Sequence, residues 1–362
     1  MKLGEYPRNN MQWQAVLGKE CLKVSDRYSR QILFSPIGKE GQAKLKNKHV
    51  LIVGAGALGA ANAEVLARAG VGRITIADRD YVEWSNLQRQ QLYTEEDAKQ
   101  RMPKATAAAK RLRKINSDVE ISPHILDVGV QELEALITHV DLIIDAADNF
   151  DIRLMINDLA QKREIPWIYG GCVGSYGLSF SILPGLSPCL MCLMETIPIE
   201  RVTCDTAGVI QPAIQMVVSY QTSEAFKILV EDDQSLRRTL VSFDLWKNHH
   251  RSIDVSSLKK QECLSCGKNR SYPNLSYKNQ LKTAVLCGRD TVQIRPSHSL
   301  PINLNHLADL IGDQGIKVEQ NPFLLSFAVE DVRLVIFKDG RALVHGVTDV
   351  VKAKSLYHRY LG

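Results

Sequence analysis

Short β-branched runs alternate with longer stretches of helical character from residue 48 onward. Residues 49–53 and 73–77 have the composition of buried strands, and an alanine-rich stretch that ends at residue 69 separates them. A strand, a helix and a second strand in this order are typical of a parallel sheet. A second round predicts helices at residues 104–115 and 131–137 and strands at residues 119–125, 140–146 and 166–170. We therefore expect an α/β fold with a doubly wound, Rossmann-like and mostly parallel sheet.

Later segments predict antiparallel additions to that sheet. Residues 175–183 alternate between apolar and polar side chains, as an added antiparallel strand would. Residues 209–230 are largely apolar and long enough for a buried helix, in which Pro212 would occupy the first turn, where proline is tolerated. We expect residues 240–244 to form the strand that closes the sheet.

A polar stretch without a sustained apolar period divides the chain near its end. We predict an N-terminal extension at residues 1–26, a main domain at residues 27–267, a linker at residues 268–280 and a small C-terminal α/β module at residues 281–362. The module should contain a strand at residues 291–294, a helix at residues 304–311, short strands up to residue 344 and a helix at residues 349–360. The module has no recognisable group of catalytic residues, and its role is open.

The composition is that of a globular protein and argues against two classes of partner. The 362 residues are 45% hydrophobic, which is ample for a core. The formal charge of +5 is spread along the chain without a Lys/Arg block, so nucleic acid is not an expected partner. The longest apolar runs are strand-sized, far short of the ~20 residues of a membrane helix. Residues 1–23 do not resemble a secretory signal, which favours the cytoplasm.

Four of the eight cysteines form two Cys-x-x-Cys pairs, Cys189 with Cys192 and Cys263 with Cys266. Four thiolates at this spacing match a tetrahedral Zn²⁺ site. Because four thiolates leave no open coordination position, such a metal would be a structural clip between two distant segments. The alternative is a pair of redox or disulfide couples.

A glycine-rich turn follows the first predicted strand, with Gly54, Gly56 and Gly59 in the sequence Gly-Ala-Gly-Ala-Leu-Gly. Glycines at such a turn let backbone amides approach a phosphate group at a helix N-terminus. Asp78 ends the next strand, at about the separation where an acidic residue meets a ribose hydroxyl. These features alone fit a dehydrogenase equally well, and glycine turns of this kind also occur for packing alone.

Five ordered motifs make the assignment more specific. They are Arg27-Tyr28-Ser29-Arg30-Gln31, the glycine turn, Asp78-Arg79-Asp80 followed by Trp84-Ser85-Asn86-Leu87-Gln88-Arg89-Gln90, Pro103-Lys104, and Asp145-Ala146-Ala147-Asp148-Asn149 with Arg153. In these motifs the chain resembles ThiF, MoeB and the adenylation domains of ubiquitin-activating enzymes. The resemblance covers roughly residues 27–267.

The resemblance implies an ATP-dependent adenylyltransferase that activates the C-terminal carboxylate of a small ubiquitin-like protein. In that reaction the carboxylate attacks the α-phosphate of ATP and pyrophosphate leaves, so negative charge has to be neutralised. Arg89, with a planar fork of donors, and Lys104, with a mobile point charge, are suited to clamp the triphosphate. In the resembling enzymes the arginine that corresponds to Arg30 reaches in from a second subunit, which implies a homodimer.

Three further polar residues receive roles from their positions. Asp148 follows an apolar strand at the carboxyl edge of the sheet, where a ligand for Mg²⁺ is expected. We assign Asp78 to the ribose of ATP and Asn86 to a supporting polar contact near the phosphates.

Simpler interpretations of the same residues stay open at this point. Arg89 and Lys104 are also consistent with solvated surface charges. Asp80 is consistent with a turn or helix-cap residue, and Asp148 with the cap of a helix that begins near Phe150.

Cys204 lies just before the long apolar helix and resembles, in its placing, a cysteine that the ThiF and MoeB family uses in thiol chemistry after adenylation. A thiolate near a helix N-terminus has a lowered pKa, but the neighbouring Asp205 opposes that effect. A sulfur-handling role and an inert cysteine in a loop are both consistent with the sequence.

The resemblance implies a carrier protein with a Gly-Gly C-terminus, either ThiS-like for thiamin or MoaD-like for molybdopterin, and a separate sulfur donor. The shared motifs do not separate the two carriers. The sequence of residues 82–86 and the appended tail resemble those of bacterial ThiF and favour the ThiS-like carrier. Adenylation of a peptide in natural-product biosynthesis is an alternative. A dehydrogenase would leave Arg89, Lys104 and Asp148 without a task, and a non-catalytic scaffold would be expected to have lost one of them.

Overall fold

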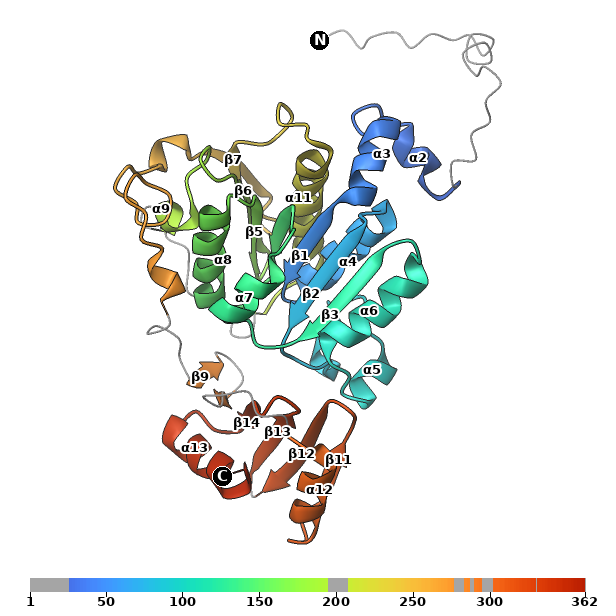
Figure 1. Ribbon diagram of the computed structural model, residues 1–362, viewed down its shortest axis with the longest axis vertical. Coiled ribbons are helices and arrows are strands. Elements are labelled where there is room, and N and C mark those ends of the chain that lie inside the picture. Colours follow the sequence, from blue (N-terminus) through green and yellow to red (C-terminus); the bar gives the residue numbers. More distant parts are fainter. Residues whose placement is uncertain are drawn as a thin grey trace.

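The computed structural model describes residues 26–194, 208–276, 283–286, 290–294, 302–329 and 331–361. Two sheets organise this part of the chain (Figure 1). The larger sheet has eight strands in the order β3-β2-β1-β4-β5-β6-β7-β8, and the smaller has six in the order β11-β12-β13-β14-β10-β9. None of the helices in the described residues is long and apolar enough to cross a membrane.

The first half of the large sheet is parallel and confirms the predicted doubly wound pattern. Its strands are β1 (His49–Val53), β2 (Arg73–Asp78), β3 (Glu120–Ile125), β4 (Leu142–Asp145) and β5 (Trp167–Val173). Its helices are α2 (Ser29–Ile32), α3 (Gly38–Asn47), α4 (Ala57–Ala69), α5 (Glu95–Lys99), α6 (Lys104–Ile115), α7 (Val130–Leu136) and α8 (Phe150–Arg163), with the short 3-10 helices η1 (Asp26–Tyr28) and η2 (Trp84–Asn86). Because β1 lies between β2 and β4, the chain order reverses at β1, which is where this fold class binds ligands.

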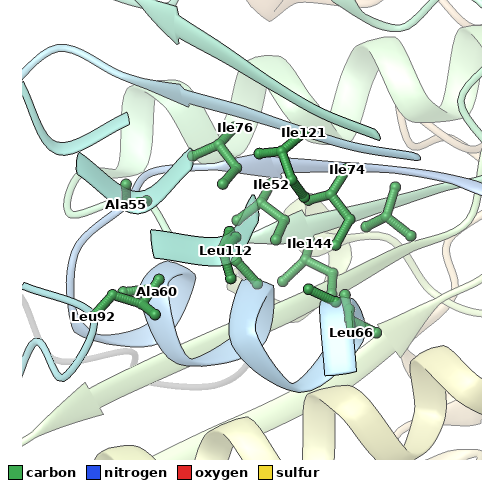
Figure 2. Packing of buried hydrophobic residues seen from close by; sticks show 14 of the residues in the cluster. Ile52, Ala55, Ala60, Leu66, Ile74, Ile76, Leu92, Leu112, Ile121 and Ile144 are labelled. Atoms are coloured by element: carbon green, nitrogen blue, oxygen red, sulfur yellow. The ribbon is translucent and has the colours of Figure 1, made fainter. Parts of the chain in front are cut away.

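Successive residues of each parallel strand enter opposite cores, as alternation in a strand requires. Val50 and Ile52 of β1 belong to the core under α4 and α6, whereas Leu51 and Val53 belong to the core under α8. Figure 2 shows the first of these cores. Its labelled residues from strands and helices are Ile52, Ile74, Ile76, Ile121, Ile144, Ala60, Leu66 and Leu112. Burial on both faces explains why these strands have nearly continuous apolar sequences.

The second half of the large sheet is antiparallel. It consists of β6 (Tyr176–Ile182), β7 (Thr239–Asp244) and β8 (His249–Asp254), and α9 (Leu190–Met194) and α11 (Gln211–Val230) belong to the same part of the chain. Pro212 lies in the first turn of α11, as predicted.

The expectation that residues 240–244 close the sheet was wrong, because β8 lies beyond β7 as the edge strand. All six residues of β8 are exposed, so its sequence shows no apolar alternation by which it could be predicted. The short η3 (Ser256–Leu258) and η4 (Pro273–Leu275) follow it.

The C-terminal module forms the small sheet, which is antiparallel throughout. Its strands are β9 (Thr283–Leu286), β10 (Thr291–Ile294), β11 (Val318–Gln320), β12 (Leu324–Val329), β13 (Val332–Phe337) and β14 (Ala342–His345). Two helices, α12 (Leu304–Gly312) and α13 (Val350–Leu361), share an apolar core with it. A second set of buried residues, Leu324, Val335, Phe337 and Leu343, packs instead against Tyr81 of the large domain.

Candidate functional site

The candidate site lies where β1, β2 and β4 end, at the carboxyl edge of the parallel sheet. The turn after β1 carries the glycines, Asp78 ends β2 and Asp80 follows it, and the segment after β4 carries Asp148. Carboxyl ends of neighbouring parallel strands meet at one edge of a sheet, so the sequence motifs converge there.

Two of the three glycines are required by backbone contacts. Gly54 has a φ of 99°, and a Cβ atom there would lie 2.3 Å from the carbonyl oxygen of Ala146. A Cβ atom on Gly59 would lie 1.9 Å from the carbonyl oxygen of Gly54. Gly56 differs, since in the described residues only the Gln90 amide nitrogen, at 3.9 Å, comes within 4 Å of its Cβ position. The turn is therefore closed behind Gly54 and Gly59 and open at Gly56, where α4 begins.

Asp78 fixes this turn from the neighbouring strand. Its carboxylate accepts the backbone N–H of Ala55 at 2.5 Å and that of Asp80 at 2.6 Å. Burial raises the pKa of Asp78, whereas the nearby charge of Lys104 lowers it. A carboxylate has about four acceptor positions, so among the described residues two positions of Asp78 remain for hydroxyl donors.

Lys104 is a buried cation and not a solvated surface charge. It is the first residue of α6, is 3% exposed, and places Nζ 3.1 Å from Oδ2 of Asp80. Because Asp80 takes part in this ion pair, it is more than a residue of the turn. The pair puts one buried positive charge next to two carboxylates at the edge of the glycine turn.

Arg89 and Asn86 lie on the turn that follows β2. Arg89 is half-buried and donates from Nη1 to the carbonyl oxygen of Ser85 at 2.8 Å. Asn86 is 1% exposed and accepts the backbone N–H of Glu83 at 3.0 Å, which closes a capping box around η2. Asn86 thus shapes the turn that carries Arg89.

Gln90 supports the interpretation of the turn as a binding site, although sequence reasoning did not single it out. Its side chain is buried and faces Gly56, and its Oε1 has no hydrogen-bond partner in the described part of the chain. Buried amide oxygens are normally paired, so an unpaired one beside an open glycine indicates room for a polar ligand. Tyr93, also not predicted, donates its hydroxyl to the carbonyl oxygen of Ala55 at 2.6 Å and fixes the turn from the same side.

Asp148 is exposed at the site, and an arginine approaches it. Arg79 Nη2 lies 3.8 Å from Oδ1 of Asp148, and Arg79 Nη1 lies 3.3 Å from Oδ1 of Asp127. Burial lowers the pKa of Arg79, but the carboxylates of Asp148 and Asp127 outweigh this effect and raise the pKa above its ordinary value. The helix α8 is capped by Asn149, which accepts the N–H of Ile152 at 3.0 Å. The cap is therefore Asn149, and Asp148 is available for another contact.

The Asp-Asn motif also contains a structural brace that the site prediction did not include. Asp145 is fully buried and pairs with Arg153 at 3.0 Å. Arg153 donates to the carbonyl oxygens of Ala147 at 2.8 Å and Gly170 at 3.0 Å. This brace holds in place the segment from β4 to α8, which carries Asp148.

Arg30 is not brought to the glycine turn of its own chain. It is exposed on α2, and its neighbour Gln31 donates to the carbonyl oxygen of Ala69 at the C-terminal end of α4. The glycine turn lies at the other end of α4, and the 13 residues of that helix span about 20 Å. Cys204 lies outside the described residues.

The four predicted cysteine ligands converge on one point. Their sulfur atoms all lie within 4.8 Å of one another. Neighbouring sulfurs are 3.9 Å apart for Cys189 and Cys192 and 3.6 Å apart for both Cys189 with Cys263 and Cys192 with Cys266. A tetrahedron with metal–sulfur bonds of ~2.3 Å has edges of about 3.8 Å. The cluster therefore has the dimensions of a tetrahedral metal site.

Adjacent residues of α8 hold both cysteine segments. Asn157 accepts the N–H of Leu190 at 2.8 Å, and Asp158 accepts the hydroxyl of Ser265 at 2.5 Å. Asp158 also accepts the N–H of Asn274 at 2.8 Å. The cysteine cluster is thus fixed to the same helix that begins beside Asp148.

Residues 28–265 match the ThiF family, which is more than half of the chain. The chain belongs to the ThiF family. It is 53% identical to the sulfur carrier protein ThiS adenylyltransferase of Bacillus subtilis, over 94% of this chain and 100% of that protein. It is 35% identical to the molybdopterin-synthase adenylyltransferase of Escherichia coli, over 67% of this chain and 96% of that protein.

A solved ThiF-like fold extends the comparison to coordinates. The crystal structure of E. coli MccB with ATP has a TM-score of 0.60 and 24% identity, covering 68% of this chain and 75% of that chain. At this identity the likeness supports the fold alone. The family membership predicted from the five motifs is confirmed by the sequence comparisons.

We expect Gly59→Ala to distort the glycine turn, because the added Cβ would collide with the carbonyl oxygen of Gly54. The expected cost in free energy of unfolding is about 3 kcal/mol, as for other overpacked sites, measured by urea denaturation. Gly56→Ala is the matched control, since its Cβ position is open, and it should change the unfolding free energy by less than about 0.5 kcal/mol. Equal stability losses in the two variants would contradict this picture of the turn.

Replacing one ligand of the cysteine cluster should release a bound metal and lower the stability. For Cys263→Ser we expect loss of metal by mass spectrometry and a Tm lower by about 10 °C, or about 3 kcal/mol for a chain of this size. Cys172→Ser, a buried cysteine outside the cluster, should keep the full metal content. If the protein as purified held no metal, the site would have been misassigned.

Proposed function

We propose that this ThiF-family protein adenylates the C-terminal glycine carboxylate of a ubiquitin-like sulfur-carrier protein, with ThiS-like carriers favoured over MoaD-like ones. The observation that carries the proposal is the buried Lys104–Asp80 pair beside the open glycine turn, in a chain 53% identical to a ThiS adenylyltransferase. A dehydrogenase needs the turn and Asp78, but it does not need a buried cation at this point.

ATP fits the site through its ribose and its phosphates. The free acceptor positions of Asp78 are suited to ribose hydroxyls, and the amides around Gly56 at the start of α4 are suited to phosphate oxygens. Gln90 Oε1 offers a further buried acceptor beside the turn. Lys104 and Arg89 are the cations assigned to the triphosphate, and Arg89 would turn away from Ser85 to reach it.

Asp148 is the residue that would hold Mg²⁺, because its exposed carboxylate stands at the edge of the site and oxygen ligands suit this ion. When bound, the ion neutralises charge on the phosphates and lowers the cost of separating pyrophosphate. The guanidinium of Arg79 places a positive charge near the same carboxylate.

The reaction needs no oxidant and no covalent enzyme intermediate at the adenylation step. An oxygen of the carrier's terminal carboxylate forms a bond to the α-phosphorus, the bond to the bridging oxygen of the β-phosphate breaks, and pyrophosphate leaves with that electron pair. Lys104 and Arg89 act by stabilising the negative charge that develops on the phosphates. A sulfur donor would then convert the carrier adenylate to a thiocarboxylate and release AMP. Cys204 is our candidate for the sulfur step.

A homodimer is part of the proposal because Arg30 lies far from the glycine turn of its own chain. The length of α4 separates the two, so an Arg30 that contacts the phosphates has to come from a second copy.

Zn²⁺ is our choice for the four-cysteine cluster, since four thiolates in a tetrahedron suit this ion. Residues 27–267 would form the ATP-binding domain, and the cytoplasm is the compartment that suits such thiolates.

The proposal is tested by ATP–pyrophosphate exchange with a ThiS-like and a MoaD-like carrier compared side by side. We expect exchange that depends on a carrier, with the higher kcat/KM for the ThiS-like protein. Lys104→Met should lower kcat/KM by at least about 100-fold, as expected for loss of one charge-stabilising group. Lys110→Met, an exposed lysine on the same helix, should leave the rate unchanged. Exchange in the absence of any carrier would overturn the assignment, and so would a lack of exchange with both carriers.

A further inference from the structure

The C-terminal module contacts the back of the segment that carries the site aspartates. Asp78 and Asp80 face the glycine turn and Lys104. The backbone carbonyl of Arg79 and the side chains of Tyr81 and Glu83 meet the module instead, whereas the Arg79 guanidinium lies near Asp127 and Asp148. The side chains of Asp78 and Asp80 thus alternate with those of Tyr81 and Glu83, as expected for an extended segment. One face of the segment therefore belongs to the nucleotide site and the other to the module.

An apolar contact anchors the module to this segment. The ring of Tyr81 is 4% exposed and packs in a cluster with Leu324, Val335, Phe337 and Leu343. Its hydroxyl accepts a hydrogen bond from Nη2 of Arg333 at 2.8 Å, and Arg333 also lies 3.6 Å from Glu83. At the rim, Arg101 and Glu319 form an ion pair at 2.7 Å.

Arg341 is a buried cation of the module in direct contact with this segment. It is 2% exposed, its guanidinium lies 3.8 Å above the Phe337 ring, and its Nη2 donates to the carbonyl oxygen of Arg79 at 2.6 Å. Its Nη1 has no hydrogen-bond partner within the described ranges. Burying a charged side chain away from water costs free energy, so a buried charge usually has a structural or functional role.

A second contact of the module reaches the side chain of Arg79 through Asp127. Gln293 on β10 donates from Nε2 to Asp127, and Asp127 accepts from Nη1 of Arg79 at 3.3 Å. The module therefore holds Arg79 twice, at its backbone through Arg341 and at its guanidinium through Asp127. Nη2 of that guanidinium lies 3.8 Å from Oδ1 of Asp148.

We propose that Arg341 is a positioning residue for the nucleotide site, which fixes Arg79 so that its guanidinium holds the carboxylate of Asp148 in place for Mg²⁺. Arg341 touches no substrate and acts through Arg79. The C-terminal module is then a wall of the active site and not an independent appendage. This inference rests on the proposed function for the role of Asp148, but it concerns metal-dependent binding of ATP and not the carrier.

The test measures the affinity of the full-length chain for ATP, with and without Mg²⁺, by calorimetry. For Arg341→Met we expect about tenfold weaker binding of MgATP, which corresponds to loss of one hydrogen bond to a charged group, and a much smaller change for ATP in EDTA. Arg341→Lys should recover part of the loss. Arg359→Met, an exposed arginine on α13 of the same module, is the matched control and should bind MgATP as the wild type does.

A double-mutant cycle separates positioning from a general structural role. In an Asp148→Asn background, Arg341→Met should weaken binding less than about twofold, because the residue through which it acts is gone. Gln293→Leu provides a milder variant if Arg341→Met does not fold, and it should weaken MgATP binding in the same direction. Equal losses with and without Mg²⁺, or full additivity with Asp148→Asn, would overturn the inference. Failure of both carriers in pyrophosphate exchange would overturn the proposed function alone, since these binding measurements need no carrier.

Discussion

The candidate site depends on a group of buried charges at the carboxyl end of β2, formed by Asp78, Asp80 and Lys104. Asp78 and Asp80 are both buried, and burial of two neighbouring carboxylates is tolerated only where donors and a counter-charge meet them. The backbone N–H of Ala55 and the ammonium of Lys104 supply these. The glycine turn, the start of α6 and the end of β2 therefore have to assemble together. A site fixed in this way presents Lys104 and the two carboxylates in place, so these groups need little rearrangement when a nucleotide binds.

The parallel half of the fold could be predicted because its strands are buried on both faces and its glycines stand where backbones collide. The motif order assigned Lys104 to the triphosphate, but its burial beside Asp80 could not be predicted from periodicity and is seen only in the structure. The edge strand β8 was missed because all of its side chains face solvent. The pairing of Arg79 with Asp127 was missed because it joins residues 48 positions apart in the sequence, and only the packed sheet brings them together.

The C-terminal module shows how a segment without catalytic residues can still contribute to a site. One set of its buried residues packs under α12 and α13, while Leu343 and its neighbours pack on Tyr81. Its charged contacts, Arg341 on the carbonyl of Arg79 and Arg333 near Glu83, lie along the reverse side of the aspartate segment. Contacts between residues 262 positions apart leave no local pattern in the sequence, so the module could be predicted as a fold but not as a support for the site.

The proposed reaction requires the group around Asp78, Asp80 and Lys104 to bind ATP so that a carrier carboxylate displaces pyrophosphate. This requirement can be tested by intact-mass spectrometry of a ThiS-like carrier that has been incubated with the protein, MgATP and pyrophosphatase. We expect the carrier to gain one adenylyl group at its C-terminal glycine and a carrier without its last glycine to gain none. A carrier of unchanged mass, with ATP either untouched or split to ADP and phosphate, would contradict it.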